Sequence, residues 1–472
     1  MDWQIEGQEC LDIISTSYED LPSYLKPCFM YIASFPEDYK IKASSLTRLW
    51  IAEGFIIHHD PTRAIEEIAQ SYLEELVQRC MFQVSERSWS GRIKHCYIHD
   101  ILRELAVQKA AEENFLLIFS KSNANSTSGT STSARRIAFH EFGSTELPKE
   151  SIIGPKLRSL ISFGDHFPNI QKLRMVRVIH SENSEIDENL QRMKQSTTLR
   201  YFRSYTILKL PNSFWNNKML RYVRAENYSY GQFVSGPSSS VKLENLEVLK
   251  GVFIARDEWT VRFPHFPRIR KLGIKISNRT NWEAMANSIT KLENLESLFL
   301  GSNGLSHPVI THAFKDYERM HSLYLCCLWP GRRIGDSSLF PPRLLKLTLR
   351  RSFLEQDPMQ ELEKLSNLRV LRLLYESYKG EQLICSAGGF RRLQQLKLHG
   401  LSSLKELKVE DGAMPLLKQL EISYCIHMEM LPDLQYLTRL EELKLKRMLP
   451  AFNCLLEGPD RHKVEHIPSI SI

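Results

Sequence analysis

The sequence lacks the features of a membrane-spanning, secreted or metal-binding protein. No run of 18 or more residues is apolar, so no segment predicts a transmembrane helix. The N-terminus, Met1–Glu6, does not join a basic region to an apolar one, and we expect no secretory signal peptide. The nine cysteines stand singly apart from Cys326 and Cys327, with no CxxC pair and no His/Cys cluster at metal-ligand spacing. These absences predict a cytoplasmic protein with free thiols and no metal.

Motifs for catalysis and for phosphate binding are missing as well. No G-x-x-x-x-G-K-[ST] sequence occurs, so the chain has no phosphate-cradling loop and no lysine to reach the outer phosphates. It has no nucleophile elbow and no pair of acids in a shared motif. The short run His58-His59-Asp60 lies in a predicted loop, where solvated side chains are expected. We therefore expect that the chain is not an enzyme.

The net charge of +7 is unevenly distributed along the chain. Residues 1–120 carry 11 lysines and arginines against 19 acidic residues, a net charge of −8. The remaining 352 residues carry 51 against 36, a net charge of +15. An acidic first part and a basic second part can attract each other within one molecule, or attract different partners. The alternative is that the basic groups are spread over a solvated surface.

The apolar pattern of the first part predicts three helices followed by a β-hairpin. The first helix is expected from Tyr24 to Phe35, where Pro36 stops it. The other two are expected over about residues 43–53 and 63–79. Gly54 should end the second helix in the left-handed conformation that glycine favours. The strands are expected over residues 81–86 and 92–98, joined by a polar turn. Three helices and a hairpin predict a winged-helix domain over residues 21–119, preceded by residues 1–20 as the tail of a larger region.

The segment from Cys96 to Ala106 predicts a strand end, a polar His-Asp pair and an amphipathic helix. Asp100 is a good helix N-cap, since its carboxylate can accept the free N–H groups of the first turn. The apolar residues that follow stand at helical spacing, and we expect this helix to continue to about residue 119. Without other information, His99 would be a capping or core-edge histidine.

The second part of the chain is an array of LxxLxL repeats. Residues 120–133 are almost entirely Ser, Thr, Asn, Gly and Ala, which predicts a flexible linker. From residue 134 to 472 the motif recurs, most clearly at Leu295–Leu300, Leu368–Leu373 and Leu440–Leu445, mostly every 23–26 residues. This period predicts a leucine-rich-repeat solenoid of about thirteen turns, an α/β horseshoe with a parallel sheet on its concave face. The Leu404/Leu407 pair falls within one period, on the expected return path.

The residues between the leucines of the C-terminal repeats are rich in lysine and arginine. Because alternate residues of a strand face opposite sides, these side chains are expected on the concave surface. The predicted partner-binding residues are Lys346, Arg350, Arg369, Arg372, Lys397, His399, Lys418, Lys444 and Lys446. Such a basic stripe can bind an acidic protein surface. For any single residue, the alternative is that it only keeps an exposed sheet soluble.

Several long segments resemble one protein family. The segments LPSYLKPCFMYIASFPEDYKI, LTRLWIAEGFI and YLEELVQRCMF are similar, in order and spacing, to the winged-helix (ARC2) part of the plant nucleotide-binding leucine-rich-repeat disease-resistance proteins, in their coiled-coil-bearing branch. The segment CYIHDILRELA resembles the MHD element of that family, with Ile98 at the methionine position. Departures are small, such as Cys80 where serine is usual.

The resemblance implies an intracellular receptor of plant innate immunity that triggers defence and hypersensitive cell death. Its repeats would recognise a pathogen effector or a guarded host protein, and other receptors of the family are further candidate partners. His99 would contact the β-phosphate of ADP in the off state, with Asp100 shaping the MHD-like element. The early repeats, including Tyr228, Tyr230 and Trp259, would contact the winged helix and contribute to autoinhibition.

The family's phosphate loop, its first ARC segment and its coiled-coil domain would all precede Met1. We therefore expect the C-terminal portion of a receptor, a truncated gene model or a truncated paralogue. ADP or ATP would be the cofactor of a complete family member, whereas this chain alone is expected to bind neither. One hydrogen bond from His99 to a phosphate is worth about 1.5–3 kcal/mol, and micromolar affinity needs about 8 kcal/mol.

Two other classes of function fit parts of the sequence. A truncated leucine-rich-repeat decoy or adaptor scaffold would use the repeats and no nucleotide switch. A winged-helix DNA binder would need basic and polar residues on its reading helix. The second helix offers Arg48 beside Glu53 and mostly apolar side chains, and the domain is acidic, which disfavours DNA binding.

Overall fold

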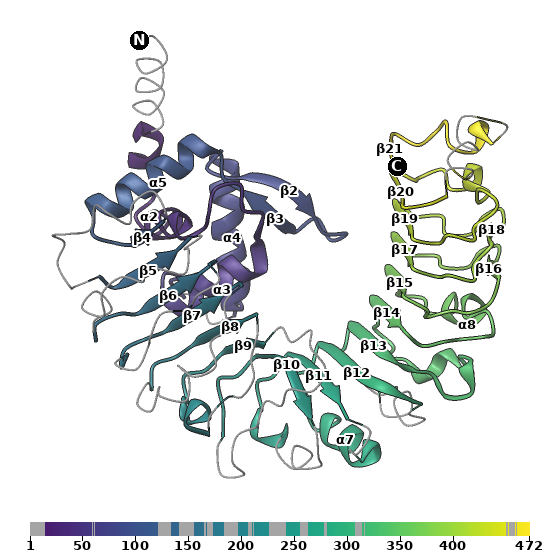
Figure 1. Ribbon diagram of the computed structural model, residues 1–472, viewed down its shortest axis with the longest axis horizontal. Coiled ribbons are helices and arrows are strands. Elements are labelled where there is room, and N and C mark those ends of the chain that lie inside the picture. The colour runs from purple at the N-terminus through teal and green to yellow at the C-terminus, as the bar shows by residue number, and fades with distance from the viewer. Residues whose placement is uncertain are drawn as a thin grey trace, which may run out of the picture. The chain divides into compact units, whose positions relative to one another are not determined.

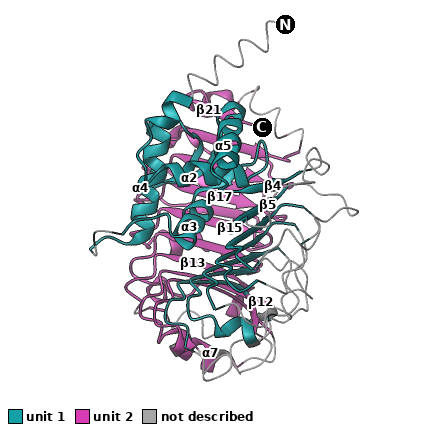
Figure 2. Ribbon diagram, turned by 90° about the vertical axis from the view of Figure 1, so that its left-hand side faces the viewer, with its two compact units in different colours: residues 1–251 teal, residues 252–472 magenta. Residues whose placement is uncertain are grey.

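The structure is a computed structural model in which the described residues form two compact units, residues 1–251 and 252–472 (Figures 1 and 2). Each unit is treated separately below. The described residues are 15–58, 60, 62–120, 134–140, 155–164, 167, 173–183, 197–205, 210, 212–225, 242–254, 263–277, 281–306, 314–315, 317–449, 452, 458 and 460–472.

The first unit begins with the helices that the sequence predicts. Helix α2 (Lys26–Met30) continues into the 3₁₀ turn η1 (Tyr31–Ser34), and Phe35 is extended because Pro36 follows it. Helix α3 (Ala43–Glu53) ends at Gly54, which has a φ of 89°. The remaining helices are α4 (Ile65–Gln78) and α5 (Asp100–Glu112).

A small antiparallel sheet completes this domain. Its strands are β1 (Ile41–Lys42), β2 (Gln83–Arg87) and β3 (Ile93–Tyr97), in the order β1-β3-β2. Strands β2 and β3 form the predicted hairpin, and β3 also pairs with β1. The helices and hairpin confirm the predicted winged-helix fold.

Seven parallel strands follow, paired in chain order; six lie within the first unit, and the seventh runs across its end at residue 251. They are β4 (Leu117–Phe119), β5 (Arg136–Phe139), β6 (Ser159–Ser162), β7 (Val178–Ser181), β8 (Tyr201–Ser204), β9 (Tyr222–Ala225) and β10 (Val248–Ile254). The 3₁₀ turn η2 spans Asn212–Asn216. The prediction that the last helix of the winged helix reaches residue 119 is wrong. That helix stops at Glu112, and Asn114 takes a positive φ of 49° before the chain enters β4.

The winged helix and these early turns share one apolar core. Trp50 and Leu49 of α3 and Phe29 of α2 belong to the same buried cluster as Ile161 and Val178 of the parallel strands. Within this unit α3 lies against β7 and β8, and η1 lies against β5 (Figures 1 and 2). A continuous core makes the docked winged helix part of the folded unit.

The second unit holds the more regular repeats, again as parallel strands in chain order (Figure 1). The ladder consists of β11 (Lys271–Ile276), β12 (Ser297–Ser306), β13 (Ser322–Leu328), β14 (Lys346–Arg350), β15 (Val370–Leu374), β17 (Gln395–His399), β19 (Gln419–Ser423), β20 (Glu442–Lys446) and β21 (Ser469–Ser471). Alternate leucines such as Leu347 and Leu349 are fully buried, which is the expected role of the LxxLxL motif.

The return segments of this unit are mostly irregular. Among its described residues, the α-helices are α7 (Trp282–Ile289) and α8 (Met359–Leu362). The 3₁₀ turns are η4 (Phe263–His265), η5 (Pro330–Arg332), η6 (Ser337–Leu339), η7 (Leu434–Tyr436) and η8 (Arg461–Lys463). Strands β16 (Gln382–Cys385) and β18 (Glu406–Val409) form a separate parallel pair, and Leu407 lies there as predicted for the return path. The predicted winged helix followed by a leucine-rich-repeat solenoid is therefore confirmed, with few helices in the solenoid.

Some predictions fall outside the described residues. These are most of the predicted tail, the linker at residues 121–133, and the aromatic residues Tyr228, Tyr230 and Trp259. Within the part of the chain that the structure describes, no helix combines the length and the apolar character needed to span a bilayer.

Candidate functional site

The C-terminal end of α3 is held by arginines from the early turns of the solenoid. The last carbonyls of a helix have no partner within the helix, and they carry the negative end of its dipole. Arg177 Nη1 donates to the Glu53 carbonyl at 2.9 Å, and Arg200 Nη1 donates to the Ala52 carbonyl at 3.4 Å. Gly54 turns the chain away immediately afterwards, and a Cβ there would lie 3.9 Å from both guanidinium groups. The helix end is thus capped by residues far away in the sequence.

A buried ion pair lies at the same place. Arg136 Nε is 3.1 Å from Glu53 Oε2, with the two side chains 9% and 0% exposed. Ser159 donates to the other carboxylate oxygen. The Arg136 guanidinium also lies 4.2 Å from the ring centroid of Phe115 and 5.0 Å from that of Phe55. Hydrogen bonds on both carboxylate oxygens and rings against the guanidinium compensate for taking two charges out of water.

Arg177 and Arg200, which hold the end of α3, belong to a row of five arginines across consecutive turns. Arg135, Arg158, Arg177, Arg200 and Arg221 are linked in order, each backbone N–H donating to the carbonyl of the one before. Burial and the neighbouring arginines lower the pKa of Arg158 and of Arg177, while the charge of Glu53 opposes that shift. We call this set the arginine row. Like charges repel one another. Glu53 and the negative end of the α3 dipole therefore stabilise the arginine row, and the row in turn holds the end of α3.

A second ionic contact joins α4 to the solenoid. Glu66 accepts hydrogen bonds from Tyr222 Oη at 2.9 Å and from Arg221 Nη2 at 3.3 Å. Arg221 also pairs with Glu247 at 2.5 Å, so two carboxylates share one guanidinium. Burial and the hydrogen bond with Glu66 raise the pKa of Glu247 to about 7. One of the two carboxylates therefore holds a proton over much of the acidic range.

We predict that Glu247→Gln flattens the pH dependence of stability. A folded-state pKa above the ordinary value means that the folded chain keeps a proton that the unfolded chain loses between about pH 4.5 and 7. The stability of the wild type therefore falls as the pH rises through that window, by on the order of 1–3 kcal/mol. Glutamine mimics the protonated group and removes this loss. Thermal melting from pH 5 to 8 measures it, with exposed Glu244→Gln as control, and parallel curves for all three proteins would contradict the prediction.

A third contact lies around the loop after η1. Glu182 accepts from Tyr39 Oη at 2.9 Å and from Arg203 Nη2 at 2.8 Å, and it lies 3.0 Å from His180 Nε2. Phe163 packs against Tyr39 and Phe35, with centroids at 4.9 Å and 5.7 Å. This contact adds an apolar and a charged component to the packing of the domain on the solenoid.

A buried histidine adds a neutral hydrogen bond to this third contact. His140 Nε2 lies 2.9 Å from the carbonyl of Ser34, and burial lowers the pKa of His140 to about 4. The ring is therefore neutral near pH 7 and donates from Nε2. The three contacts together form what we call the docking interface.

The MHD-like element lies at the start of α5, at a different place from these contacts. Ile98 is buried in the core, whereas His99 and Asp100 are exposed. The prediction that Asp100 is the N-cap is wrong. His99 is the N-cap, with extended φ and ψ of −67° and 144°, Asp100 is the first helical residue, and no side chain caps α5. Asp100 still stands at the positive end of the helix dipole, where a carboxylate is favourable.

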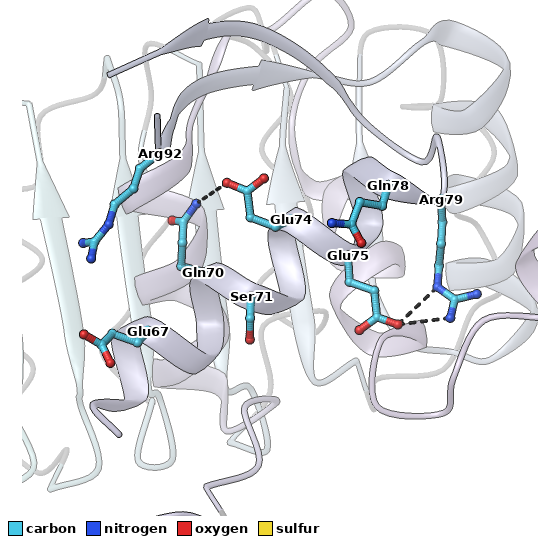
Figure 3. Close-up of a pocket in the computed structure, with 8 residues that line it drawn as sticks. All are labelled: Glu67, Gln70, Ser71, Glu74, Glu75, Gln78, Arg79 and Arg92. Carbon is cyan, nitrogen blue, oxygen red and sulfur yellow. Dashed lines mark hydrogen bonds and ion pairs between the residues drawn. The ribbon is translucent and has the colours of Figure 1, made fainter. Parts of the chain in front are cut away.

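The helix that a DNA-binding winged helix would use is covered. Arg48 of α3 is half-buried, and its guanidinium lies 5.5 Å from the ring centroid of Tyr222. The exposed surface of the domain is acidic. A shallow groove of about 680 Å³ runs along α4 and is lined by Glu67, Gln70, Ser71, Glu74, Glu75, Gln78, Arg79 and Arg92 (Figure 3). Glu75 is paired there with Arg79 at 3.1 Å. Both features disfavour a duplex-binding role.

The predicted partner-binding residues of the second unit lie mostly where alternation places them. Lys346, Arg350, Arg372, Lys397, His399, Lys444 and Lys446 fall on strands β14, β15, β17 and β20, out of phase with the buried leucines. Arg369 and Lys418 do not lie on a strand of the ladder. Each stands one residue before its strand, because β15 begins at Val370 and β19 at Gln419. Their inclusion in the strand face is corrected accordingly.

The predicted basic stripe is also interrupted by acidic residues. Lys397 pairs with Glu421 at 2.7 Å, Lys418 with Glu441 at 2.6 Å and Lys444 with Glu442 at 2.7 Å. Arg372 Nη2 donates to Gln395 Oε1 at 3.0 Å. Three of the nine predicted basic residues are therefore paired with carboxylates.

Sequence reasoning named the early repeats as the contact region but missed the residues that make the contact. Arg158, Arg177, Arg200 and Arg221 each stand directly before a strand, at the same place in successive turns. That regular position was visible in the sequence once the turns were aligned. The buried Glu53 gave no comparable signal, since a glutamate at a helix C-terminus is usually solvated.

Comparisons with known proteins identify both parts of the chain. The family model for the disease resistance protein winged-helix domain matches residues 35–106, and the model for a leucine-rich repeat region matches residues 163–454. A probable disease resistance RPP8-like protein 4 of Arabidopsis thaliana is 33% identical over 521 residues, covering 99% of this chain and 56% of that protein. The disease resistance protein RPP8 of the same plant is 33% identical over 502 residues, covering 97% and 54%.

A solved leucine-rich-repeat protein of Leptospira interrogans is 16% identical with a TM-score of 0.45, covering 75% of this chain and 99% of its own. The chain spans about half the length of the curated relatives it matches. The family models and the relatives agree with the order of domains in the structure. The chain belongs to the plant disease-resistance proteins and contains their winged-helix domain followed by their leucine-rich repeats.

Proposed function

We propose that this chain acts in plant innate immunity as the sensing half of an intracellular receptor. Its solenoid recognises a pathogen effector or a guarded host protein, and its winged helix belongs to an ADP/ATP-dependent switch in a complete receptor that triggers hypersensitive cell death. The observation that carries the proposal is the docking interface. It joins the winged helix to the early turns through a buried Glu53–Arg136 pair and arginine caps on α3.

The docking interface suits a switch because its parts depend on one another. Removing one partner of a buried ion pair costs about 3–5 kcal/mol, since the other charge stays buried and unpaired. A partner that shifts the early turns would misplace several guanidinium groups at once, because the arginine row is linked strand to strand. The winged helix would then lose its caps and its ion pair together. The off state is stable until recognition alters the turns.

The position of His99 suits contact with a phosphate group of a nucleotide and not with the rest of the nucleotide. Its side chain is exposed at the N-terminus of the 13-residue helix α5, whose first-turn N–H groups have no side-chain cap. Helix N-termini and an imidazole N–H both favour a phosphate. ADP, when bound in a complete receptor, would supply that phosphate. His99 would donate to it, Asp100 would fix the helix start, and Ile98 would anchor the element in the core.

We expect Asp100→Val in a complete receptor carrying these residues to cause cell death without an effector. An exposed carboxylate in the first turn of a helix contributes about 0.3–1 kcal/mol, so the fold survives the change. A signalling effect therefore reports on the switch. Ion leakage from leaf tissue expressing the variant measures the response, with Glu104→Gln on the same helix as the matched control. Quiet behaviour of Asp100→Val at normal protein level would rule out the switch role.

The decoy or adaptor alternative makes a different prediction for the same receptor. An adaptor binds its partner through the repeats whether or not the winged helix can switch. Asp100→Val would then leave both partner binding and leaf tissue unchanged. Co-precipitation of the partner together with the leakage assay separates the two functions.

A further inference from the structure

The ends of five consecutive strands in the second unit form two lateral rows of side chains. The last residues of β14, β15, β17, β19 and β20 are in register, and they are Arg350, Leu374, His399, Ser423 and Lys446. The residue after each forms the second row: Arg351, Tyr375, Gly400, Tyr424 and Arg447. Backbone bonds such as Tyr424 N–H to Lys446 O at 3.0 Å extend the ladder into this second row. We call the two rows together the strand-end rim; Figure 1 labels the strands β14, β15, β17, β19 and β20 at whose ends it lies.

Every residue of the second row has a left-handed backbone. The φ angles of Arg351, Tyr375, Tyr424 and Arg447 are 50°, 41°, 55° and 55°, and that of Gly400 is 65°. This conformation costs about 1–2 kcal/mol for each residue other than glycine. The turn accepts glycine at one of the five positions, so the geometry alone does not demand arginine or tyrosine at the others. Strain retained for large, exposed side chains points to a role for those side chains.

The side chains of the rim are arranged in advance. The Arg350 guanidinium lies 4.4 Å from the ring centroid of Tyr375, and it shares a hydrogen bond with Tyr324. The rings of Tyr375 and His399 are 4.6 Å apart, and those of His399 and Tyr424 are 5.1 Å apart. His399 Nδ1 lies 2.6 Å from Ser423 Oγ. Tyr375 and Tyr424 nevertheless remain 42% and 49% exposed. A cluster held in place in this way loses little entropy on binding.

The charge of the rim is of one sign. Arg350, Arg351, Lys446 and Arg447 are cationic, and none of the ten rim residues is acidic. Glu376, the next residue after Tyr375, is engaged by Lys379 and by Ser402 Oγ, the latter at 2.6 Å. Elsewhere in these turns, Lys397, Lys418 and Lys444 are each paired with a glutamate. The rim therefore carries four cationic side chains and no carboxylate.

We infer that the strand-end rim binds an acidic segment of a protein partner, an inference that rests on the proposed function and locates its recognition surface. Guanidinium groups bind carboxylates in paired geometry, and exposed tyrosine hydroxyls donate to the same oxygens. Nucleic acid would need open aromatic faces for stacking. Here Arg350 covers Tyr375, and His399 contacts both tyrosines, so the rings support hydrogen bonding at their exposed edges.

The test uses the whole chain and a fluorescein-labelled poly-glutamate peptide followed by fluorescence anisotropy. We expect salt-sensitive binding that the double variant Lys446→Gln/Arg447→Gln weakens about tenfold, equivalent to about 1.4 kcal/mol. Tyr375→Ala should weaken the binding about fivefold, because it removes the ring that holds the Arg350 guanidinium in place. The matched control, Lys418→Gln/Lys444→Gln, removes the same charge from lysines that are already paired. It should change the affinity less than about twofold.

Three results would overturn the inference. One is no binding of poly-glutamate by the wild type. Another is an equal loss in both double variants, which indicates a net-charge effect only. The third is tighter binding of single-stranded poly-dT than of poly-glutamate, which indicates a nucleic-acid surface. None of them bears on the Asp100→Val leaf assay, so a failure here is distinguishable from a failure of the proposed function.

Discussion

Replacing Glu53 with alanine is expected to lower the free energy of unfolding of the first unit by about 3–5 kcal/mol. The carboxylate is fully buried between Arg136 and Ser159, and its removal leaves the Arg136 charge buried with no counter-charge beside it. The arginine row also loses the one carboxylate that offsets its mutual repulsion at Arg158 and Arg177. The loss should therefore exceed that of an ordinary surface ion pair, which is about 0–1 kcal/mol.

Hydrogen–deuterium exchange of the whole chain is the measurement that localises this effect. Exchange should rise in α3 and in the strands β5 to β8, while β14 and β15 of the second unit serve as an internal reference. Glu67→Ala is the matched control, because Glu67 is an exposed glutamate on the neighbouring helix α4. Glu53→Gln should fall between the two, since the amide oxygen still accepts from Arg136 but carries no charge. Equal protection of α3 in wild type and Glu53→Ala would show that the pair does not hold the winged helix.

In complete receptors the same substitution should act on signalling. If docking holds the off state, removing about 3–5 kcal/mol from the docked state shifts the population toward the undocked one by about a hundredfold to several thousandfold. Leaf tissue expressing Glu53→Ala would then leak ions without an effector. If the tissue leaks no ions although hydrogen–deuterium exchange confirms undocking, then undocking alone does not activate the switch.

Local features of the chain were predictable from the sequence. Pro36 and Gly54 end their helices as expected, because each restricts or permits backbone angles whatever surrounds it. The leucine spacing likewise predicted the solenoid, since each turn can bury its leucines only against its neighbours. These features depend on short stretches of chain.

The remaining features depend on tertiary context. Arg177 before a strand looks the same in sequence whether it is solvated or caps a distant helix. Asp100 and His99 are both acceptable N-caps, and the choice between them rests on one pair of backbone angles. Arg369 and Lys418 were misplaced because a shift of one residue moves a side chain to the other face of a strand. A stripe of lysines can also be neutralised by glutamates from adjacent turns, and only the register reveals this.

Replacing Phe163 with alanine is expected to undock the winged helix through its apolar contact with the solenoid. Phe163 lies on the solenoid and is 5% exposed, and it packs against Phe35 and Tyr39 of the winged helix. Truncating a buried phenylalanine costs about 3–5 kcal/mol, which is comparable with the loss expected for Glu53→Ala. The substitution removes no charged group, so its direct effect is a loss of apolar packing alone. Phe340→Ala in the second unit is the matched control, since that ring is similarly buried against Trp329.

The double variant Glu53→Ala/Phe163→Ala tests whether the docking interface behaves as one cooperative contact. If either change alone releases the winged helix, the second finds its partners already separated, and the effects of the two fall short of additivity by more than about 1 kcal/mol. If the domain instead loosens locally around each site, the two effects add, since Glu53 bonds to Arg136 and Ser159 whereas Phe163 packs against Phe35 and Tyr39. Chemical denaturation of the four proteins, combined with exchange in α3, measures the difference. If the losses in free energy of unfolding are additive, the winged helix does not switch between only a docked and a released state. That result would also contradict the proposal that recognition in the solenoid frees the whole domain in one step.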